Sequence, residues 1–200
     1  MDNLKNLTKS EHRNAERTTF MRRLIKKNIT PEQYYVYLKN QLAVYTTLEF
    51  YASRKNIFEG EMSKLERSPA LLEDLLEMES AENFNSLGDN LILSTAIDYI
   101  KYIEEIQNNK DRLFAHIYVR HMGDLSGGQM IKKLVPGPTS FYEFDSDTEY
   151  LKSKIREKLH DGLVDEAKVC FGMVQDFLEE LERYFNGTDS EVMAKTKQIC

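Results

Sequence analysis

Apolar residues recur along much of the chain at intervals of three and four, the period of a buried helix face. The clearest case is residues 31–55, with Tyr34, Leu38, Leu42, Tyr45, Leu48 and Tyr51. Thr30 and Pro31 mark its start, because Thr is a good N-cap and Pro fits the first helical position. No stretch of the sequence sustains the apolar–polar alternation of a strand. The pattern predicts an all-α fold.

Further helices are expected over residues 4–17, 61–79, 90–107 and 110–135. Glycines interrupt the fourth of these, and Val135-Pro136-Gly137-Pro138 ends it. A last helical region begins after a cap at Asp145 or Asp147, breaks near Gly162 and runs to about Phe185. With 200 residues, 41% of them hydrophobic, the chain matches one domain over 1–200. We expect residues 187–200 to form a flexible tail.

The charge and cysteine content limit the class of protein. A net charge of −6 argues against a nucleic-acid partner. The two cysteines are far apart and lack metal-site spacing, which favours a reducing, cytoplasmic setting. The N-terminal sequence is polar, and no apolar run approaches the ~20 residues of a membrane span. We therefore expect a cytoplasmic monomer without a membrane anchor.

The stretch HMGDLSGGQM, residues 121–130, contains LSGGQ, the string that marks the signature loop of ATP-binding cassette ATPases. That loop works beside a P-loop, G-x-x-x-x-G-K-[ST], which this chain lacks. Three glycines within six helical residues still need a reason, since each costs about 1 kcal/mol relative to Ala. Glycine lets a helix bend and lets another body approach its backbone. A flat ligand and close helix–helix packing would both account for them.

A second pattern lies near the N-terminus. Spacings of four, three and four place Lys5, Lys9, His12 and Glu16 on one helix face. His12 can offer a neutral imidazole nitrogen to a metal, and Glu16 can orient the ring through the other nitrogen. The two lysines suit a ligand that carries carboxylates. Taken alone, the spacing is explained more simply by a solvated face with charge pairs.

The segment AHIYVRHMGDLSGGQMIKK, residues 115–133, resembles the distal-helix signature of the haem oxygenase family. The likeness extends to LKNLTKSEHRNAE, to PEQYYVYLKNQLAVYTTLE, to SFYEF and to DEAKVCF. It implies a single-domain helical fold with haem between a proximal and a kinked distal helix. It also implies oxidative cleavage of haem to biliverdin, CO and ferrous iron with O2 and external electrons.

The resemblance assigns roles to individual residues. His12 would bind iron, and Asp124 would anchor waters that deliver a proton to iron-bound oxygen, with Tyr45 and Arg120 in the same polar network. Lys152 and Arg156, four residues apart on one helix face, would bind the propionates. The remaining predicted haem contacts are Lys5, Lys9, Glu16, Met21, Tyr118, Gly123, Ser126, Gly127, Gly128 and Phe171.

Haem b would serve as both cofactor and substrate in such a protein. The chain ends in AKTKQIC and lacks the apolar tail of membrane-bound relatives. The resemblance therefore implies electrons from a soluble donor, either a ferredoxin or an NADPH-dependent reductase.

Two residues depart from the family pattern. His121 stands where relatives often have an aromatic residue, and we interpret it as peripheral. Val174 stands where relatives often have Asn, so one element of the distal network is missing or replaced by water. These departures leave open a haem carrier or sensor without turnover.

Other interpretations also remain. His116 lies within the distal motif and is expected to pack and to hydrogen-bond. A helical interaction module without a cofactor is another hypothesis. The E-x-x-H string at residues 157–160 raises a di-iron site, which needs a second such string that the chain lacks.

Overall fold

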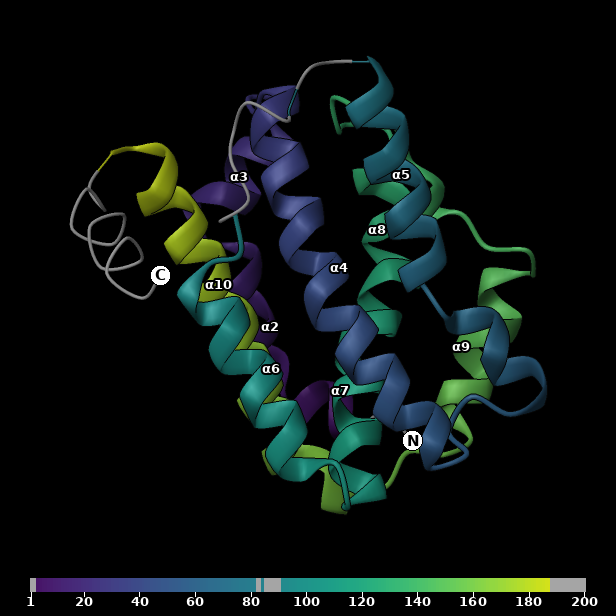
Figure 1. Ribbon diagram of the computed structural model, residues 1–200. Coiled ribbons are helices and arrows are strands. Elements are labelled where there is room, and N and C mark those ends of the chain that lie inside the picture. The colour runs from purple at the N-terminus through teal and green to yellow at the C-terminus, as the bar shows by residue number, and fades with distance from the viewer. Residues whose placement is uncertain (1–2, 82–83, 85–90, 188–200) are drawn as a thin grey trace.

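A computed structural model describes residues 3–81, 84 and 91–187, and every regular element in these ranges is a helix (Figure 1). The all-α prediction is confirmed. Residues 188–200, most of the predicted tail, lie outside the described part. The elements are α1 Asn3–Leu7, α2 Lys9–Glu16, α3 Thr19–Ile25, α4 Pro31–Arg54, η1 Gly60–Leu65, α5 Ser68–Ala81, α6 Ser94–Ile106, α7 Lys110–Ser126, α8 Gly128–Ile131, η3 Ser140–Tyr142, α9 Thr148–Arg156, η4 Asp161–Leu163 and α10 Val164–Phe185.

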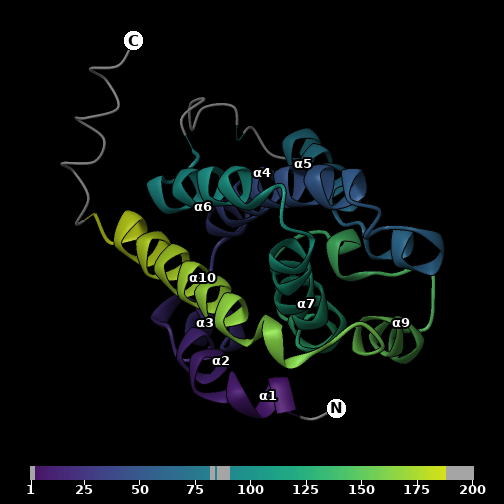
Figure 2. The ribbon, with the colours of Figure 1, turned by 90° about the horizontal axis from the view of Figure 1, so that it is seen from below.

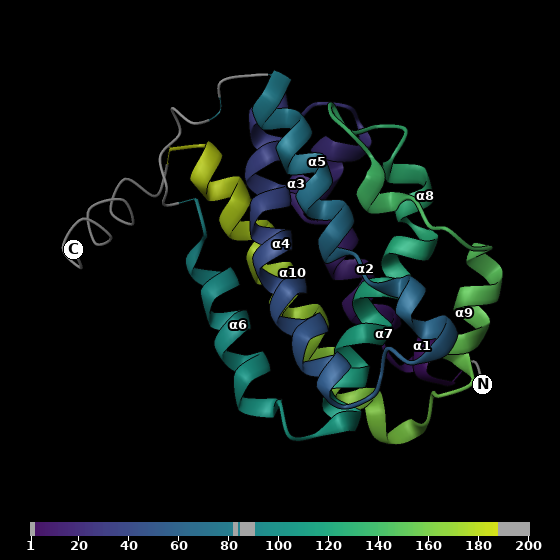
Figure 3. The same cartoon turned by 45° about the vertical axis from the view of Figure 1, so that its right-hand side comes forward.

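Helix α4 begins where the sequence predicts. Thr30 Oγ1 accepts a hydrogen bond from the backbone N–H of Gln33, and Gln33 Oε1 accepts one from the Thr30 N–H, which forms a capping box. The helix contacts α5, α6 and α7, and Figure 3 shows it between α5 and α6. Tyr34, Leu38 and Leu48 are fully buried. This long helix is therefore a central support for the rest of the fold.

The N-terminal segment differs from the single helix predicted over 4–17. It forms α1 and α2, which meet at Thr8. Thr8 Oγ1 donates to the Leu4 carbonyl oxygen at 2.9 Å, and such back-bonding by a threonine bends a helix. Lys5 thus precedes the junction, whereas Lys9, His12 and Glu16 lie on α2. Helix α3 was not predicted.

Other helix boundaries also shift from those predicted. The 61–79 segment starts as the 3-10 helix η1, and α5 begins only at Ser68. The 110–135 segment divides at Gly127 into α7 and α8. Asp147 caps α9 by accepting a hydrogen bond from the Tyr150 N–H at 2.7 Å. Helix α9 ends at Arg156 and α10 begins at Val164, so the predicted break near Gly162 falls within the interruption between them, at η4.

Helix α10 connects the parts of the fold that carry the predicted site residues. It contacts α2 and α3 on one side and α6 and α7 on others. Figure 2 shows α7 between α10 and α9, and α7 contacts both. Among the described helices, none is both long and apolar enough to cross a membrane.

Candidate active site

Arg120 and Asp124, in the second half of α7, lie beside Tyr45 on the facing helix α4. The Tyr45 hydroxyl donates to Asp124 Oδ2 at 2.6 Å. The Arg120 guanidinium lies over the Tyr45 ring, 4.7 Å from its centroid. Burial raises the pKa of Asp124, and the charge of His121, the Tyr45 hydrogen bond and the charge of Arg120 oppose the rise. The three predicted catalytic residues thus form one buried polar network.

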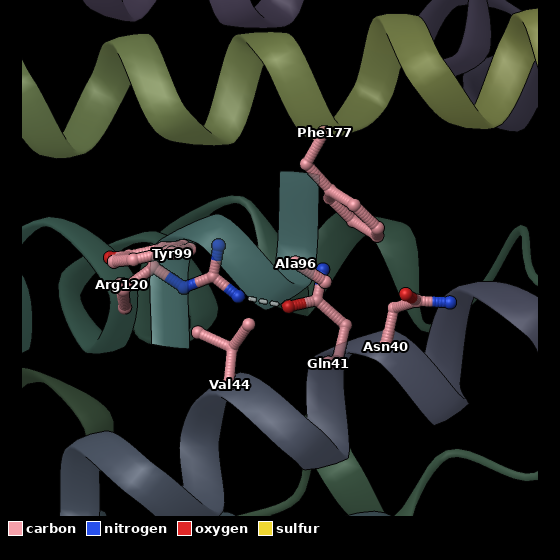
Figure 4. Close-up of a pocket in the computed structure, with 7 residues that line it drawn as sticks. All are labelled: Asn40, Gln41, Val44, Ala96, Tyr99, Arg120 and Phe177. Atoms are coloured by element: carbon pink, nitrogen blue, oxygen red, sulfur yellow. Dashed lines mark hydrogen bonds between the residues drawn. The ribbon is translucent and has the colours of Figure 1, made fainter. Parts of the chain in front are cut away.

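Arg120 also reaches α4 through a residue that the sequence reasoning missed. Its guanidinium donates to Gln41 Oε1, and Figure 4 shows this bond with the Tyr99 ring beside it and Phe177 on α10. Arg120 Nε has no hydrogen-bond partner among the described residues. Gln41 lies four residues before Tyr45 on α4, and that spacing is the signal that would have identified it.

The glycines of α7 have different surroundings. Gly123, Ser126 and Gly127 are exposed and follow the i, i+3, i+4 pattern of one helix face. A Cβ added at Gly123 would meet nothing within 4 Å, and one at Gly127 only the Gly123 carbonyl oxygen at 3.5 Å. Gly128 is buried instead, and its Cβ would lie 2.8 Å from Tyr142 Cδ1. The backbone is therefore accessible at Gly123 and Gly127 on this exposed face, whereas the absence of a side chain at Gly128 leaves room for the Tyr142 ring.

On the proximal side, the His12 side chain is 53% exposed. Its Nδ1 lies 3.5 Å from Glu16 Oε2. Its ring meets the Phe171 ring edge-on, with 5.6 Å between the centroids. No described residue hydrogen-bonds Nε2. One ring nitrogen is therefore oriented by Glu16 and the other is free, while Met21 lies partly buried against the core.

The predicted propionate-binding residues converge on one carboxylate. Lys152 Nζ lies 2.7 Å from Glu149 Oε1, and Arg156 Nη1 lies 3.7 Å from Glu149 Oε2. Burial raises the pKa of Tyr118, which a hydrogen bond with Thr8 and the charge of Arg156 oppose. Tyr118 on α7 is thereby close to both α9 and the α1–α2 junction. Lys5 and Lys9 are exposed nearby on α1 and α2.

Both histidines of α7 are fully buried. His116 lies 2.9 Å from Glu166 through Nε2 and 2.7 Å from the Tyr99 hydroxyl through Nδ1, a packing and hydrogen-bonding position. The interpretation of His121 as peripheral is wrong, because its ring centroid lies 5.3 Å from that of Tyr45. The Nε2 atom of His121 lies 3.2 Å from its hydrogen-bond partner, Glu49 Oε1 on α4. Val174 on α10 is partly buried and packs against the core.

A metal site made of protein groups alone finds no support. The described residues contain no group of three His, Cys, Asp or Glu side chains placed to hold an ion. In the E-x-x-H string, Glu157 pairs with Lys154 at 2.8 Å, and His160 is half exposed beside Asp111. A single imidazole such as that of His12 can hold a metal ion only if a cofactor supplies the other ligands. Haem fits these residues, because they also offer a bare helix face and a pair of cations.

Comparisons with known proteins agree with this geometry. The model of the heme oxygenase family matches residues 1–180. Heme oxygenase 1 of Nostoc sp. is 30% identical, over 88% of this chain and 82% of that protein. Heme oxygenase 2 of Oryctolagus cuniculus is 29% identical, over 95% of this chain and 68% of that protein.

Solved structures show the same likeness. The heme oxygenase from Leptospira interrogans is 30% identical, with a TM-score of 0.75 over 88% of this chain and 97% of that one. Heme oxygenase-1 from Synechocystis sp. PCC6803, solved in complex with heme, is 25% identical, with a TM-score of 0.77 over 96% of each chain. The chain therefore belongs to the haem oxygenase family.

Proposed function

We propose that this protein cleaves haem to biliverdin, CO and ferrous iron, using O2 and electrons from an external donor. The observation that carries the proposal is the exposed face of Gly123, Ser126 and Gly127 beside the buried carboxyl group of Asp124. A flat ring can approach bare backbone closely, and an ionisable group at its edge can handle protons. Membership of the family supports the same reaction.

Binding depends on the proximal helix and on α9. His12 Nε2 binds the iron, and Glu16 holds the ring through Nδ1. Bound haem supplies the iron that takes up O2 and the ring that is oxidised. Lys152 and Arg156 would exchange their ion pairs with Glu149 for charge-assisted hydrogen bonds to a propionate. Lys5 and Lys9 add positive charge on the same side.

Proton delivery depends on Asp124. Tyr45 occupies Oδ2, and Oδ1 receives no hydrogen bond from the described residues, so it can accept one from a water. Burial raises the pKa of Asp124 above that of a free carboxyl group, which makes the group a better proton acceptor. Tyr45 and Arg120 fix the direction of the carboxyl group. We assign Asp124 the role of holding the water and passing its proton.

We further propose that the protein works as a cytoplasmic monomer with a soluble ferredoxin or NADPH-dependent reductase. Exposed Lys5 and Lys9 and half-exposed Arg156 place positive charge beside the site on a chain of net charge −6. Such local charge steers an acidic donor to the site. The free, buried thiol of Cys170 is typical of a reducing compartment.

A haem titration followed by turnover tests the proposal. The apoprotein is titrated with haem without oxygen, and reduced ferredoxin or ascorbate is then added under air. We expect stoichiometric binding, loss of the Soret band and the absorption spectrum of biliverdin. The matched variant Asp124→Asn keeps the shape of the side chain and should bind haem but form little biliverdin. A Soret band that persists in the wild-type protein would instead identify a haem carrier or sensor.

A further inference from the structure

His121 occupies a buried site directly behind the distal network. It lies on α7 one helical turn before Asp124, and none of its surface is exposed. Nδ1 lies 3.2 Å from the Ile117 carbonyl oxygen, and Nε2 lies 3.2 Å from Glu49 Oε1. The ring faces Tyr45 and Phe58, with centroids 5.3 and 5.6 Å away. The imidazole thus contacts the residue that hydrogen-bonds Asp124.

The hydrogen-bond partners fix the charge of this ring. A carbonyl oxygen only accepts, so Nδ1 must donate. Glu49 Oε1 also accepts from the Arg67 N–H at 2.6 Å, and Oε2 accepts from the Ser68 N–H at 3.0 Å and from the Ser68 hydroxyl. Donors from Arg67 and Ser68 occupy three of the four acceptor directions of the carboxylate, and the fourth faces Nε2. The proton on that axis belongs to the imidazole, which is the more basic of the two groups. Both ring nitrogens of His121 therefore carry hydrogens, and the ring is an imidazolium.

Glu49 is well suited to hold this charge. Burial acts to raise its pKa, but hydrogen bonds from His121, Ser68 and the Arg67 backbone outweigh burial and lower it. The charged and titratable groups around His121 are Tyr45 and Glu49 on α4, Glu66 and Arg67 before α5, and Asp124 on α7. Those acting on Asp124 include His121, Tyr45, Arg120 and Arg67, with Tyr37 and Tyr142 also within reach.

We infer that the His121 imidazolium, held by Glu49, is a positioning residue of the distal site that favours the ionised form of the Asp124 carboxyl group. The inference rests on the proposed function for its catalytic meaning. Glu49 lies one turn beyond Tyr45 on α4, whereas His121 lies one turn from Asp124 on α7. The positive member of the pair therefore acts on Asp124. An uncharged aromatic side chain at position 121 would leave Glu49 without its His121 partner and Asp124 without this stabilisation.

The charge of His121 is tested first in the unaltered protein without haem. NMR of ring-nitrogen-labelled histidine distinguishes an imidazolium, with two protonated nitrogens, from either neutral tautomer. We expect the His121 signals to show two protonated nitrogens near neutral pH. A neutral tautomer would overturn the inference, and this measurement needs no variant to fold.

Two variants then separate charge from packing. His121→Gln keeps a donor for Glu49 but removes the charge, whereas His121→Lys keeps both donor and charge but loses the ring. The titration of Asp124 is followed in each apoprotein by carboxyl-carbon NMR, with Asp124→Asn used to assign the signal. Loss of a nearby opposite charge should raise the midpoint by about 1–3 pH units in His121→Gln. His121→Lys should restore most of the wild-type value. Equal midpoints in all three proteins would refute the inference.

Turnover gives an independent readout. If the proposed function holds, the pH profile of biliverdin formation in His121→Gln should shift upwards by the same amount as the Asp124 midpoint. His121→Lys should follow the wild-type profile. Absence of turnover in the wild-type protein would refute the proposed function alone, because the Asp124 titration is measured without haem. A turnover profile that stays in place while the midpoint moves would remove the catalytic part of the inference.

Discussion

Replacing Gly123 by Ala should stabilise the apoprotein and weaken haem binding at the same time. Gly123 lies inside α7, is exposed, and offers 4 Å of free space to an added Cβ. Since Gly in a helix interior costs about 1 kcal/mol relative to Ala, the free energy of unfolding should rise by about that amount. For a chain of this length that corresponds to an increase in Tm of roughly 2–4 °C.

The same methyl group should obstruct haem binding sterically. If the ring lies against the bare backbone at Gly123, the methyl group occupies space that the ring needs. Crowding of this kind costs about 1–3 kcal/mol, a roughly 5- to 150-fold loss of affinity. Thermal unfolding followed by circular dichroism measures the stability of the apoprotein, and a Soret titration measures the affinity.

Gly172→Ala is the matched control for this pair of effects. Gly172 lies within α10 on an exposed face with Val169 and Asp176, and its added Cβ also meets nothing within 4 Å. It should stabilise the apoprotein similarly and leave haem affinity unchanged. Gly128→Ala should instead lower Tm, because its Cβ would overlap Tyr142. Wild-type haem affinity in Gly123→Ala would show that the ring does not lie on this face.

Three further outcomes are expected. His12→Ala should lose the spectrum of an imidazole-bound ferric haem, and added imidazole should restore turnover in part; an unchanged spectrum would remove His12 as the ligand. Lys152→Ala combined with Arg156→Ala should weaken haem binding by about 1.5–3 kcal/mol for each lost charge-assisted bond, as a Soret titration would reveal, and can change the biliverdin isomer. Cys170 and Glu166 raise the pKa of His116 from 6.5 to about 9 although burial opposes them. Because the pKa of His116 is higher in the folded than in the unfolded protein, its protonation stabilises the fold fully below pH 6.5. About 3 kcal/mol of the free energy of unfolding should be lost as pH rises from 6.5 to 9. Denaturant titrations of His116→Gln should not show this loss.

The parts of the fold that sequence predicts well depend on local interactions. The start of α4 follows from Thr30, Pro31 and Gln33, which are adjacent in the chain and form the cap without help from elsewhere. The break between α1 and α2 also has a local cause, the Thr8 hydroxyl, but one threonine in a helical pattern is too common to mark a junction. Helix boundaries therefore shift by a few residues even where helices are predicted correctly.

The site itself is predictable only to the extent that its residues lie in recognisable motifs. Asp124 and the glycines stand in one segment, so the resemblance to the family identifies them together. Their surroundings depend on tertiary contacts that no local pattern reveals. Gly128 differs from Gly123 because Tyr142, brought in by η3, packs against it. His121 is mistaken for a peripheral residue because its position on α7 is visible in the sequence and its partner on α4 is not.

One regularity links these missed contacts. Gln41, Tyr45 and Glu49 follow one another on α4 at steps of four, and each hydrogen-bonds α7, through Arg120, Asp124 and His121 in that order. The three side chains form a polar stripe along a helix whose other buried residues, except Asn40, are apolar or aromatic. Because a buried polar group needs a partner, such a stripe predicts a facing helix with complementary polar groups. Helix α4 thereby fixes, through one face, both the direction of the Asp124 carboxyl group and the charge behind it.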